Sequence, residues 1–156
     1  MARNTDAEIK ILAKNRRATH EFHVLDRVEC GLVLKGTEVK SLRGGQCSIA
    51  EAFGRILHGE LFLFGSTIPV YSHGNIHNHE PARERKCLLQ RRQIEKWSKE
   101  VRQKGTTIVP LALSFKGHLV KVEMALVKGK QLHDKREDLK KREAKREIDR
   151  ATSRRR

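Results

Sequence analysis

The sequence predicts a mainly β protein with flanking helices and a basic C-terminal tail. Two observations indicate the β part. β-branched, aromatic and other apolar residues alternate with polar residues in several short runs, and glycines separate these runs. A third observation defines the tail: residues 128–156 hold thirteen Lys or Arg against six Asp or Glu, a net charge of +7. The 156 residues therefore predict one body of ordinary domain size and one arm.

We expect three segments. Residues 1–15 are polar and mixed in charge, which predicts a flexible lead-in that could settle near residues 9–12. Residues 16–127 carry the strand patterns and form the body. In residues 128–156 acids and bases interleave at helical spacing, but Leu132, Leu139 and Ile148 are the only large aliphatic residues. The tail thus buries too little apolar surface to order alone, and we expect it to be disordered alone and helical when bound.

The first strand pattern starts at Thr19. Apolar residues alternate imperfectly with polar ones over residues 22–34, which predicts one or two strands broken near Asp26 and Arg27. Gly31 is expected to mark a bulge or a sharp bend. Residues 36–45 are predicted to form a short strand bracketed by glycines.

Four elements are predicted for the middle of the chain. Ser48 and Glu51 match a capping box, which predicts a short helix. Residues 55–57 and 60–64 flank a His-Gly turn and predict a hairpin, with Leu61 and Leu63 on one face. Residues 68–71 are predicted to add a strand, and residues 73–81 a polar loop.

A basic helix, or two abutting helices, is predicted after Pro81, because apolar residues recur at threes and fours until Gly105. The clearest hairpin follows, with strands at residues 106–115 and 118–127. Six or seven short strands with two or three helices predict a small antiparallel barrel of the oligonucleotide-binding (OB) type, since closure removes sheet edges. An antiparallel sheet with helices on one face is the alternative.

The net charge of +15 and the pI near 10.2 indicate a polyanion as the partner. No run of apolar residues approaches membrane-spanning length, so nucleic acid is favoured over a membrane. Aromatic residues make up only 4% of the chain, which favours recognition of RNA shape through phosphate and 2′-hydroxyl contacts over base stacking. The three cysteines form no CxxC pair, and no secretion signal is recognised, so we expect reduced thiols and a cytoplasmic location.

Few residues suggest catalysis, because most acids alternate with Lys or Arg, and we predict that the chain is not an enzyme. A zinc site at His73, His77 and His79 is a weaker alternative to turn residues or phosphate donors, and no metal or cofactor is expected. Glu29 and Glu38 are either salt-bridged carboxylates or acceptors for a base or ribose. A cationic ridge, or merely a solvated helix face, is predicted at Arg83, Arg85, Lys86, Arg91, Arg92, Lys96 and Lys99.

Specific motifs occur in order along the chain: GLVLKGTEVKSLR at residues 31–43, KCLL at 86–89, VPL at 109–111, KGK at 128–130 and DKR at 134–136. Together they resemble the small protein B (SmpB) family of tmRNA (SsrA RNA)-binding proteins. The resemblance implies an OB-type barrel that binds the tRNA-like domain of tmRNA and delivers it to stalled ribosomes for trans-translation. It also implies that the tail senses the empty mRNA channel near the small-subunit decoding centre, and that alanyl-tRNA synthetase and elongation factor Tu act on the same RNA.

The resemblance implies Asn15, Glu29 and Leu88 as tmRNA-binding residues, and we predict that nearby basic residues support them: Arg16, Arg17, Lys40, Arg43, Arg83 and Lys86. For the ribosome it implies Gly129, His133, Asp134, Lys135 and Arg136, to which we add Lys128, Lys130, Lys140, Lys141 and Arg142.

The chain departs from many relatives at two places, with Cys87 inside a Lys-Leu-Leu-Leu run and Ala151-Thr152 where some have large apolar residues. A monomer is expected. The competing hypothesis is a general structured-RNA-binding or ribosomal-type protein without tmRNA specificity, and a metal-dependent RNA-processing enzyme is a distant third.

Overall fold

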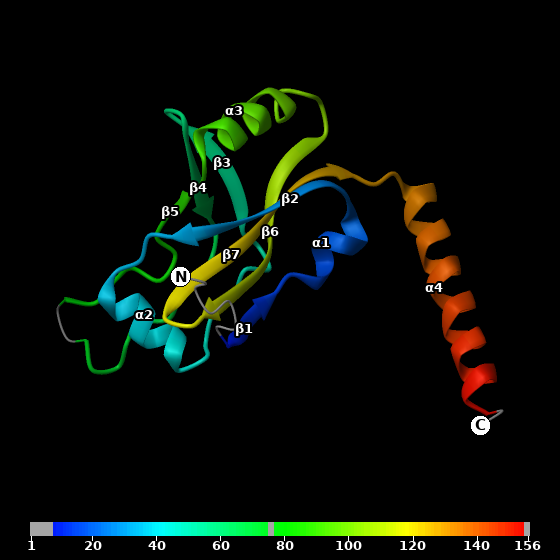
Figure 1. Ribbon diagram of the computed structural model, residues 1–156, viewed down its shortest axis with the longest axis horizontal. Coiled ribbons are helices and arrows are strands. Elements are labelled where there is room, and N and C mark those ends of the chain that lie inside the picture. The colour runs from blue at the N-terminus through cyan, green and yellow to red at the C-terminus, as the bar shows by residue number, and fades with distance from the viewer. Residues whose placement is uncertain (1–7, 75–76, 155–156) are drawn as a thin grey trace, which may run out of the picture.

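The computed structural model describes residues 8–74 and 77–154 (Figure 1). These residues form seven strands and four α-helices. In chain order the elements are β1 (Ile9–Lys14), α1 (Arg16–Glu21), β2 (Phe22–Leu32), α2 (Gly36–Arg43), β3 (Phe53–Leu57), β4 (Glu60–Phe64), β5 (Arg85–Leu88), α3 (Arg91–Glu100), β6 (Thr106–Lys116), β7 (Leu119–Gly129) and α4 (Leu132–Ser153).

All seven strands belong to one antiparallel sheet, in the order β1-β6-β3-β4-β5-β2-β7. A further ladder joins β6 to β7, so the pairings run from β6 through β3, β4, β5, β2 and β7 and return to β6. The predicted mainly β protein with flanking helices is therefore confirmed.

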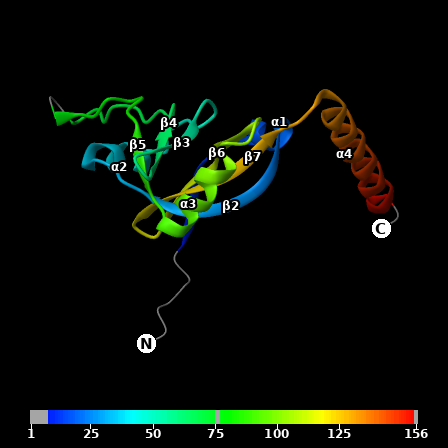
Figure 2. The same ribbon diagram turned by 90° about the horizontal axis from the view of Figure 1, so that it is seen from above.

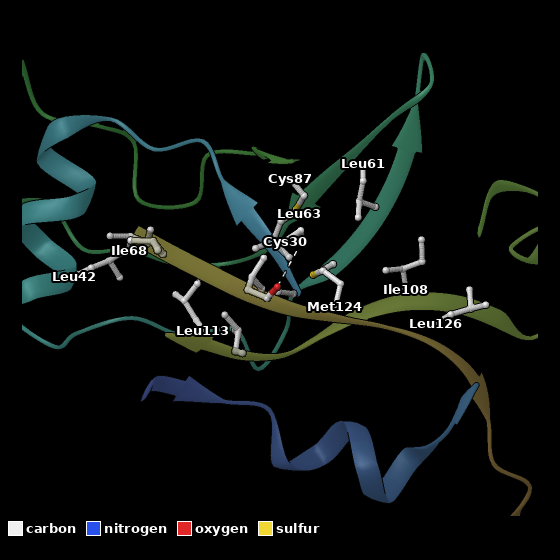
Figure 3. Packing of buried hydrophobic residues seen from close by; sticks show 14 of the residues in the cluster. Cys30, Leu42, Leu61, Leu63, Ile68, Cys87, Ile108, Leu113, Met124 and Leu126 are labelled. Carbon is white, nitrogen blue, oxygen red and sulfur yellow. Dashed lines mark hydrogen bonds between the residues drawn. The ribbon is translucent and has the colours of Figure 1, made fainter. Parts of the chain in front are cut away.

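Alternating residues of the two predicted hairpins fill the core. Leu61 and Leu63 of β4 are 0% exposed, as are Val122 and Met124 of β7. Figure 3 shows these β4 side chains together with Met124, Cys30 and Cys87 around one centre. Burying a large aliphatic side chain contributes about 1.5–3 kcal/mol, so this alternation fixes the register of both hairpins.

β2 is continuous across the predicted break. Its register against β7 shifts between Val24 and Asp26, which marks an irregularity of the bulge type. Gly31, by contrast, keeps regular pairing and is not a bulge. The charged residues 26 and 27 therefore follow a bulge and do not end the strand. The strand continues because β7 supplies pairing partners on both sides of the bulge.

Residues 36–43 form a helix, α2, and the strand predicted there is wrong. The Glu38 carboxylate accepts from the Lys35 backbone N–H at 2.9 Å, which caps the first turn. Glu38, Ser41 and Leu42 are buried, and their spacing of three and four residues places them on one helix face. Burial of this face outweighs the local strand-like pattern.

Three further predictions are also wrong. Ser48 exchanges backbone hydrogen bonds with Thr67, at 2.9 Å each way, where a short helix was predicted. The strand predicted at 68–71 is replaced by a connecting segment, in which the Ile68 N–H donates to the Pro81 carbonyl oxygen. The long helix predicted after Pro81 begins only at Arg91, because residues 85–88 pair with β4 as strand β5.

The N-terminal lead-in is also more ordered than predicted. Residues 9–14 form β1 and pair with β6, because alternating apolar residues give this segment a strand pattern. Residues 1–7 lie outside the described residues. In the predicted loop at 73–81, the described residues contain no strand or α-helix, and residues 75–76 lie outside them.

The basic tail contains one long helix, α4, which projects away from the sheet in both views (Figures 1 and 2). Every residue from 139 to 154 is exposed. The helical character of the tail agrees with its charge spacing. Its disorder in the free protein stays a prediction.

Candidate nucleic-acid interface

Gly31 lies at the centre of an exposed face of the sheet. It pairs directly with Leu88 of β5 on one side and with Lys121 of β7 on the other. Directly paired residues share a face of the sheet, and so do residues two apart in a strand, so Glu29 and Glu123 lie on this face as well. A Cβ at position 31 would meet Leu88 Cδ1 at 3.4 Å, so the Leu88 side chain lies against the glycine.

Apolar side chains extend the same face toward β1. On β6, Ser114 pairs with Ile11 of β1 on one side and with Lys121 of β7 on the other. Lys116 likewise pairs with Ile9 of β1 and with Leu119 of β7. Ile9, Ile11, Leu119 and Leu88 are each more than half exposed. We call this surface the Gly31 face: Ile9, Ile11, Glu29, Gly31, Leu88, Lys116, Leu119, Lys121 and Glu123.

Glu29 is the accessible acid of this face. Its side chain is 49% exposed, and its carboxylate lies 3.3 Å from the Lys116 ammonium. A carboxylate beside a lysine can accept from an exocyclic amine or a 2′-hydroxyl while the lysine contacts phosphate. Exposed apolar residues beside such charges are typical of a binding surface.

Glu38, the other unusual acid, is a structural residue. It is fully buried and forms ion pairs with Arg83 and with Arg85, which is also fully buried. Burial raises the pKa of Glu38. The hydrogen bonds from the Lys35 amide, Arg83 and Arg85 together lower it by more than burial raises it, so the carboxyl pKa lies below its ordinary value. The salt-bridged alternative is therefore correct for Glu38.

The same contacts remove Arg85 from the predicted ridge, because its side chain is fully buried. Arg85 also donates to the backbone carbonyl oxygens of Ser66, Pro81 and Arg83 at 2.9–3.1 Å. Arg83 keeps a quarter of its side chain exposed. Lys86 is 40% exposed and pairs with Glu60 at 2.8 Å.

Asn15 is buried, and its side chain caps the N-terminus of α1. Its side-chain oxygen accepts from the Ala18 N–H at 3.3 Å, capping the helix, and its amide donates to the Pro110 carbonyl oxygen at 3.1 Å. Asn15 thus fixes where α1 begins, and α1 presents the exposed Arg16 and Arg17. Lys40 and Arg43 are exposed on α2, with the Lys40 ammonium 5.7 Å from the centre of the Tyr71 ring.

His79 is unsuited to hold a metal. Its Nε2 lies 2.8 Å from the Ile68 carbonyl oxygen, which can only accept, so Nε2 carries the proton. Nδ1 then accepts from the Thr37 hydroxyl at 2.9 Å. Both ring nitrogens are engaged, and within residues 8–74 and 77–154 no three potential ligands gather around one point.

The base of α4 is attached to α1 and β2. The Lys130 N–H donates to the Glu21 carbonyl oxygen at 2.9 Å, and its ammonium donates to the Thr19 carbonyl oxygen at 3.0 Å. Only 6% of the Lys130 side chain is exposed, and its ammonium also pairs with Asp138. Lys130 therefore points into the junction between α1 and α4.

Asp134 strengthens this attachment. Its carboxylate accepts from the Gln131 N–H and lies 3.3 Å from His23 Nε2 on β2. The hydrogen bond with His23 lowers the pKa of Asp134 below its ordinary value, and the hydrogen bond from Lys130 does the same for Asp138. We call Thr19, Glu21, His23, Lys130, Asp134 and Asp138 the arm junction.

The remaining predicted tail residues are accessible. His133 is two-thirds exposed, and Lys135 is partly exposed. Lys128, Gly129, Arg136, Lys140, Lys141 and Arg142 are exposed. The tail residues thus separate into an inward set at the junction and an outward cationic set.

Sequence reasoning missed two groups of residues. Lys116 and Lys121 lie on the Gly31 face, and the position of Lys121 between the buried Val120 and Val122 was a signal for it. The contacts of Lys130 with α1 had no such signal, because its partners there are backbone carbonyl oxygens. None of the described helices is long and apolar enough to cross a membrane.

A small antiparallel β body with a mixed apolar and ionic face, and a projecting cationic helix, defines a protein built to bind nucleic acid. The family model described as "SmpB protein" matches residues 12–154. The chain belongs to the SmpB family, which confirms the resemblance of its motifs.

Relatives support this family over most of their length. The SsrA-binding protein of Carboxydothermus hydrogenoformans is 49% identical over 142 residues, which cover 91% of this chain and 95% of that protein. The SsrA-binding protein of Mycobacterium sp. is 50% identical over 150 residues, which cover 96% of this chain and 89% of that protein. These relatives are named for binding an RNA and not for a reaction, in agreement with the prediction that the chain is not an enzyme.

A solved structure has the same fold. It is described as "tmRNA-SmpB: a journey to the center of the bacterial ribosome", with a TM-score of 0.64 and 40% sequence identity. The match covers 77% of this chain and 85% of that chain.

Proposed function

We propose that this protein is an SsrA-binding protein, which binds the tRNA-like domain of tmRNA and delivers it to stalled ribosomes for trans-translation. The observation that carries the proposal is the grouping of Glu29, Leu88 and Lys121 around Gly31 in a chain of the SmpB family. Two of these residues, Glu29 and Leu88, belong to the set that the family resemblance assigns to tmRNA.

The Gly31 face supplies the contacts that RNA requires. Glu29 accepts from a base amine or a 2′-hydroxyl, Leu88 packs against a base or ribose, and Lys121 contacts phosphate. Asn15 acts through α1, by positioning Arg16 and Arg17. The return of the strand pairings to β6 supports an OB-type barrel as the frame of this face.

The arm senses the ribosome. Its outward cations match an RNA-walled channel, and a helix of this width fits there only when no message occupies the channel. His133 stacks on a base near the decoding centre, while Lys135 and Arg136 contact phosphate. Off the ribosome the exposed part of α4 exchanges with disordered states, since residues 139–154 bury almost no apolar surface.

The remaining partners follow from the RNA. Alanyl-tRNA synthetase and elongation factor Tu act on the same tmRNA, and the protein meets them through it. The location is the cytoplasm, where ribosomes work.

The test is a competition assay at near-physiological salt between the tRNA-like domain of tmRNA and excess bulk tRNA. Wild type should prefer the tmRNA domain, and Glu29→Ala should weaken that preference. Glu84→Ala, which removes an exposed acid elsewhere on the body, serves as the control and should leave the preference unchanged. Equal binding of both RNAs by wild type would favour the general RNA-binding protein that the net charge of +15 also permits.

A further inference from the structure

A groove runs between α3 and the turn that joins β3 to β4. One hollow of about 610 Å³ is lined by His58, Arg91, Ile94, Ser98, Lys99 and Arg102, among others. A neighbouring hollow of about 410 Å³ shares three of these residues and reaches Lys86 and Leu88. We call the two hollows together the α3 groove, and its Leu88 end meets the Gly31 face.

The groove carries an excess of positive charge. Glu60 is paired with Lys86 at 2.8 Å, and Glu95 with Arg91 at 3.3 Å. Among the described residues, no ion pair forms at Lys99 or Arg102. Their charges are therefore available to an anion in the groove.

His58 is held in an unfavourable backbone conformation at the middle of the groove. Its φ is +51°, and the next residue, Gly59, has a φ of +74°, which is the pattern of a type I′ turn. His58 is the only non-glycine residue with positive φ in the described part of the chain. Asparagine or glycine would adopt this conformation at a lower cost, and such outliers gather where a ligand is held.

We propose that the α3 groove binds the phosphodiester backbone of the tmRNA strand that continues from the Gly31 face. Lys99 and Arg102 contact phosphate oxygens, and the His58 imidazole donates a hydrogen bond to phosphate or stacks on a base. This inference rests on the proposed function, because it extends the same RNA beyond Leu88. RNA is favoured over a protein partner since the unpaired charges are cationic and the groove is continuous with the RNA face.

The first test compares two variants that each remove two positive charges. Lys99→Ala with Arg102→Ala removes two positive charges from the groove, whereas Lys104→Ala with Lys145→Ala removes two exposed cations that do not line it. We expect the groove variant to lose roughly tenfold in affinity for the tRNA-like domain at about 150 mM salt, and its salt slope to fall by roughly 1.5–2. The control should change both much less, and equal losses would overturn the proposal.

The second test separates strain from binding. His58→Asn suits the type I′ turn, so its melting temperature should equal or exceed that of wild type. If His58 contacts RNA, this stable variant should bind the tRNA-like domain several-fold more weakly than wild type. Unchanged binding by a stabilised variant would overturn the role of His58.

Failure of the groove proposal can be told apart from failure of the proposed function. If wild type fails to prefer the tRNA-like domain over bulk tRNA, the tmRNA assignment fails. The groove is then judged by whether removing Lys99 and Arg102 still weakens binding of bulk tRNA more than removing Lys104 and Lys145.

Discussion

The ammonium of Lys130 donates to the carbonyl oxygen of Thr19 at 3.0 Å, and this bond ties the cationic arm to α1. Thr19 belongs to the last turn of α1, where carbonyl oxygens lack partners within the helix. Asp138, two turns along α4, holds the same ammonium from the other side. We infer that Lys130 orients the arm, and its assignment to the ribosome contacts stays a prediction.

Lys130→Ala should impair peptide tagging while leaving affinity for the tRNA-like domain close to wild type. A hydrogen bond to a charged group contributes about 1.5–3 kcal/mol, so the equilibrium constant for holding the arm in its orientation should fall roughly tenfold or more. Tagging in a reconstituted translation system measures this. Lys104→Ala removes the same charge from an exposed position outside the arm and should cost much less.

Asp138→Asn gives a sharper version of this prediction. It makes the arm more positive, so an account based on charge alone expects tagging to be unchanged or better. Loss of the Lys130 pair should instead reduce tagging. Improved tagging would contradict the orienting role of the junction.

Changing Asp134, Lys135 and Arg136 together to Ala should abolish tagging and leave binding to the tRNA-like domain nearly intact. Asp134 supports the junction through His23, whereas Lys135 and Arg136 point outward. The Lys135→Ala, Arg136→Ala double variant should therefore also lose tagging with the junction preserved. Loss of RNA affinity in the triple variant would contradict the division of labour between body and arm.

Glu38→Gln should destabilise the body by about 3–5 kcal/mol, because it leaves the buried Arg85 without its counter-ion. Chemical denaturation measures the change. Wild-type stability should also fall in acid. The folded pKa of Glu38 lies below the unfolded value, so its contribution is present above about pH 4.3 and is lost as the pH falls through the folded pKa. This part of the pH dependence should be absent from Glu38→Gln.

Gly54→Ala should cost about 1–3 kcal/mol of stability through overpacking. A Cβ there would lie 2.7 Å from Ile108 Cγ2 and 2.9 Å from Met124 Cε, at the point where β3 meets β6. Gly36→Ala is the matched control, because no atom lies within 4 Å of its Cβ position. Thermal melts should show a clear decrease for the first variant and little change for the second.

The two hairpins were predictable from sequence because apolar runs flank short turns. In β4 the buried Leu61 and Leu63 alternate with less buried neighbours, and in β7 burial alternates from residue 119 to 124 before four consecutive buried residues, 124–127. The helix at residues 36–43 was not predictable from sequence. Glycines bracket this segment, and its helical face is defined only by burial against the body. Glu38 on that face finds its partners 45 and 47 residues away.

The candidate site was predictable in part. Glu29 and Leu88 are named by the family resemblance, and the strand register brings them together. Lys130 could not be assigned, since in the sequence it is one more lysine in a basic segment. The contacts that bury it come from α1, more than a hundred residues earlier.

The most direct test of the central claim is a reconstituted translation reaction stalled on a message without a stop codon. With tmRNA present, addition of this protein should cause the stalled peptide to acquire the tmRNA-encoded tag. The tag should disappear when the message extends through the mRNA channel beyond the stall. Tagging that does not depend on the protein, or none in its presence, would contradict the claim that it delivers tmRNA to stalled ribosomes.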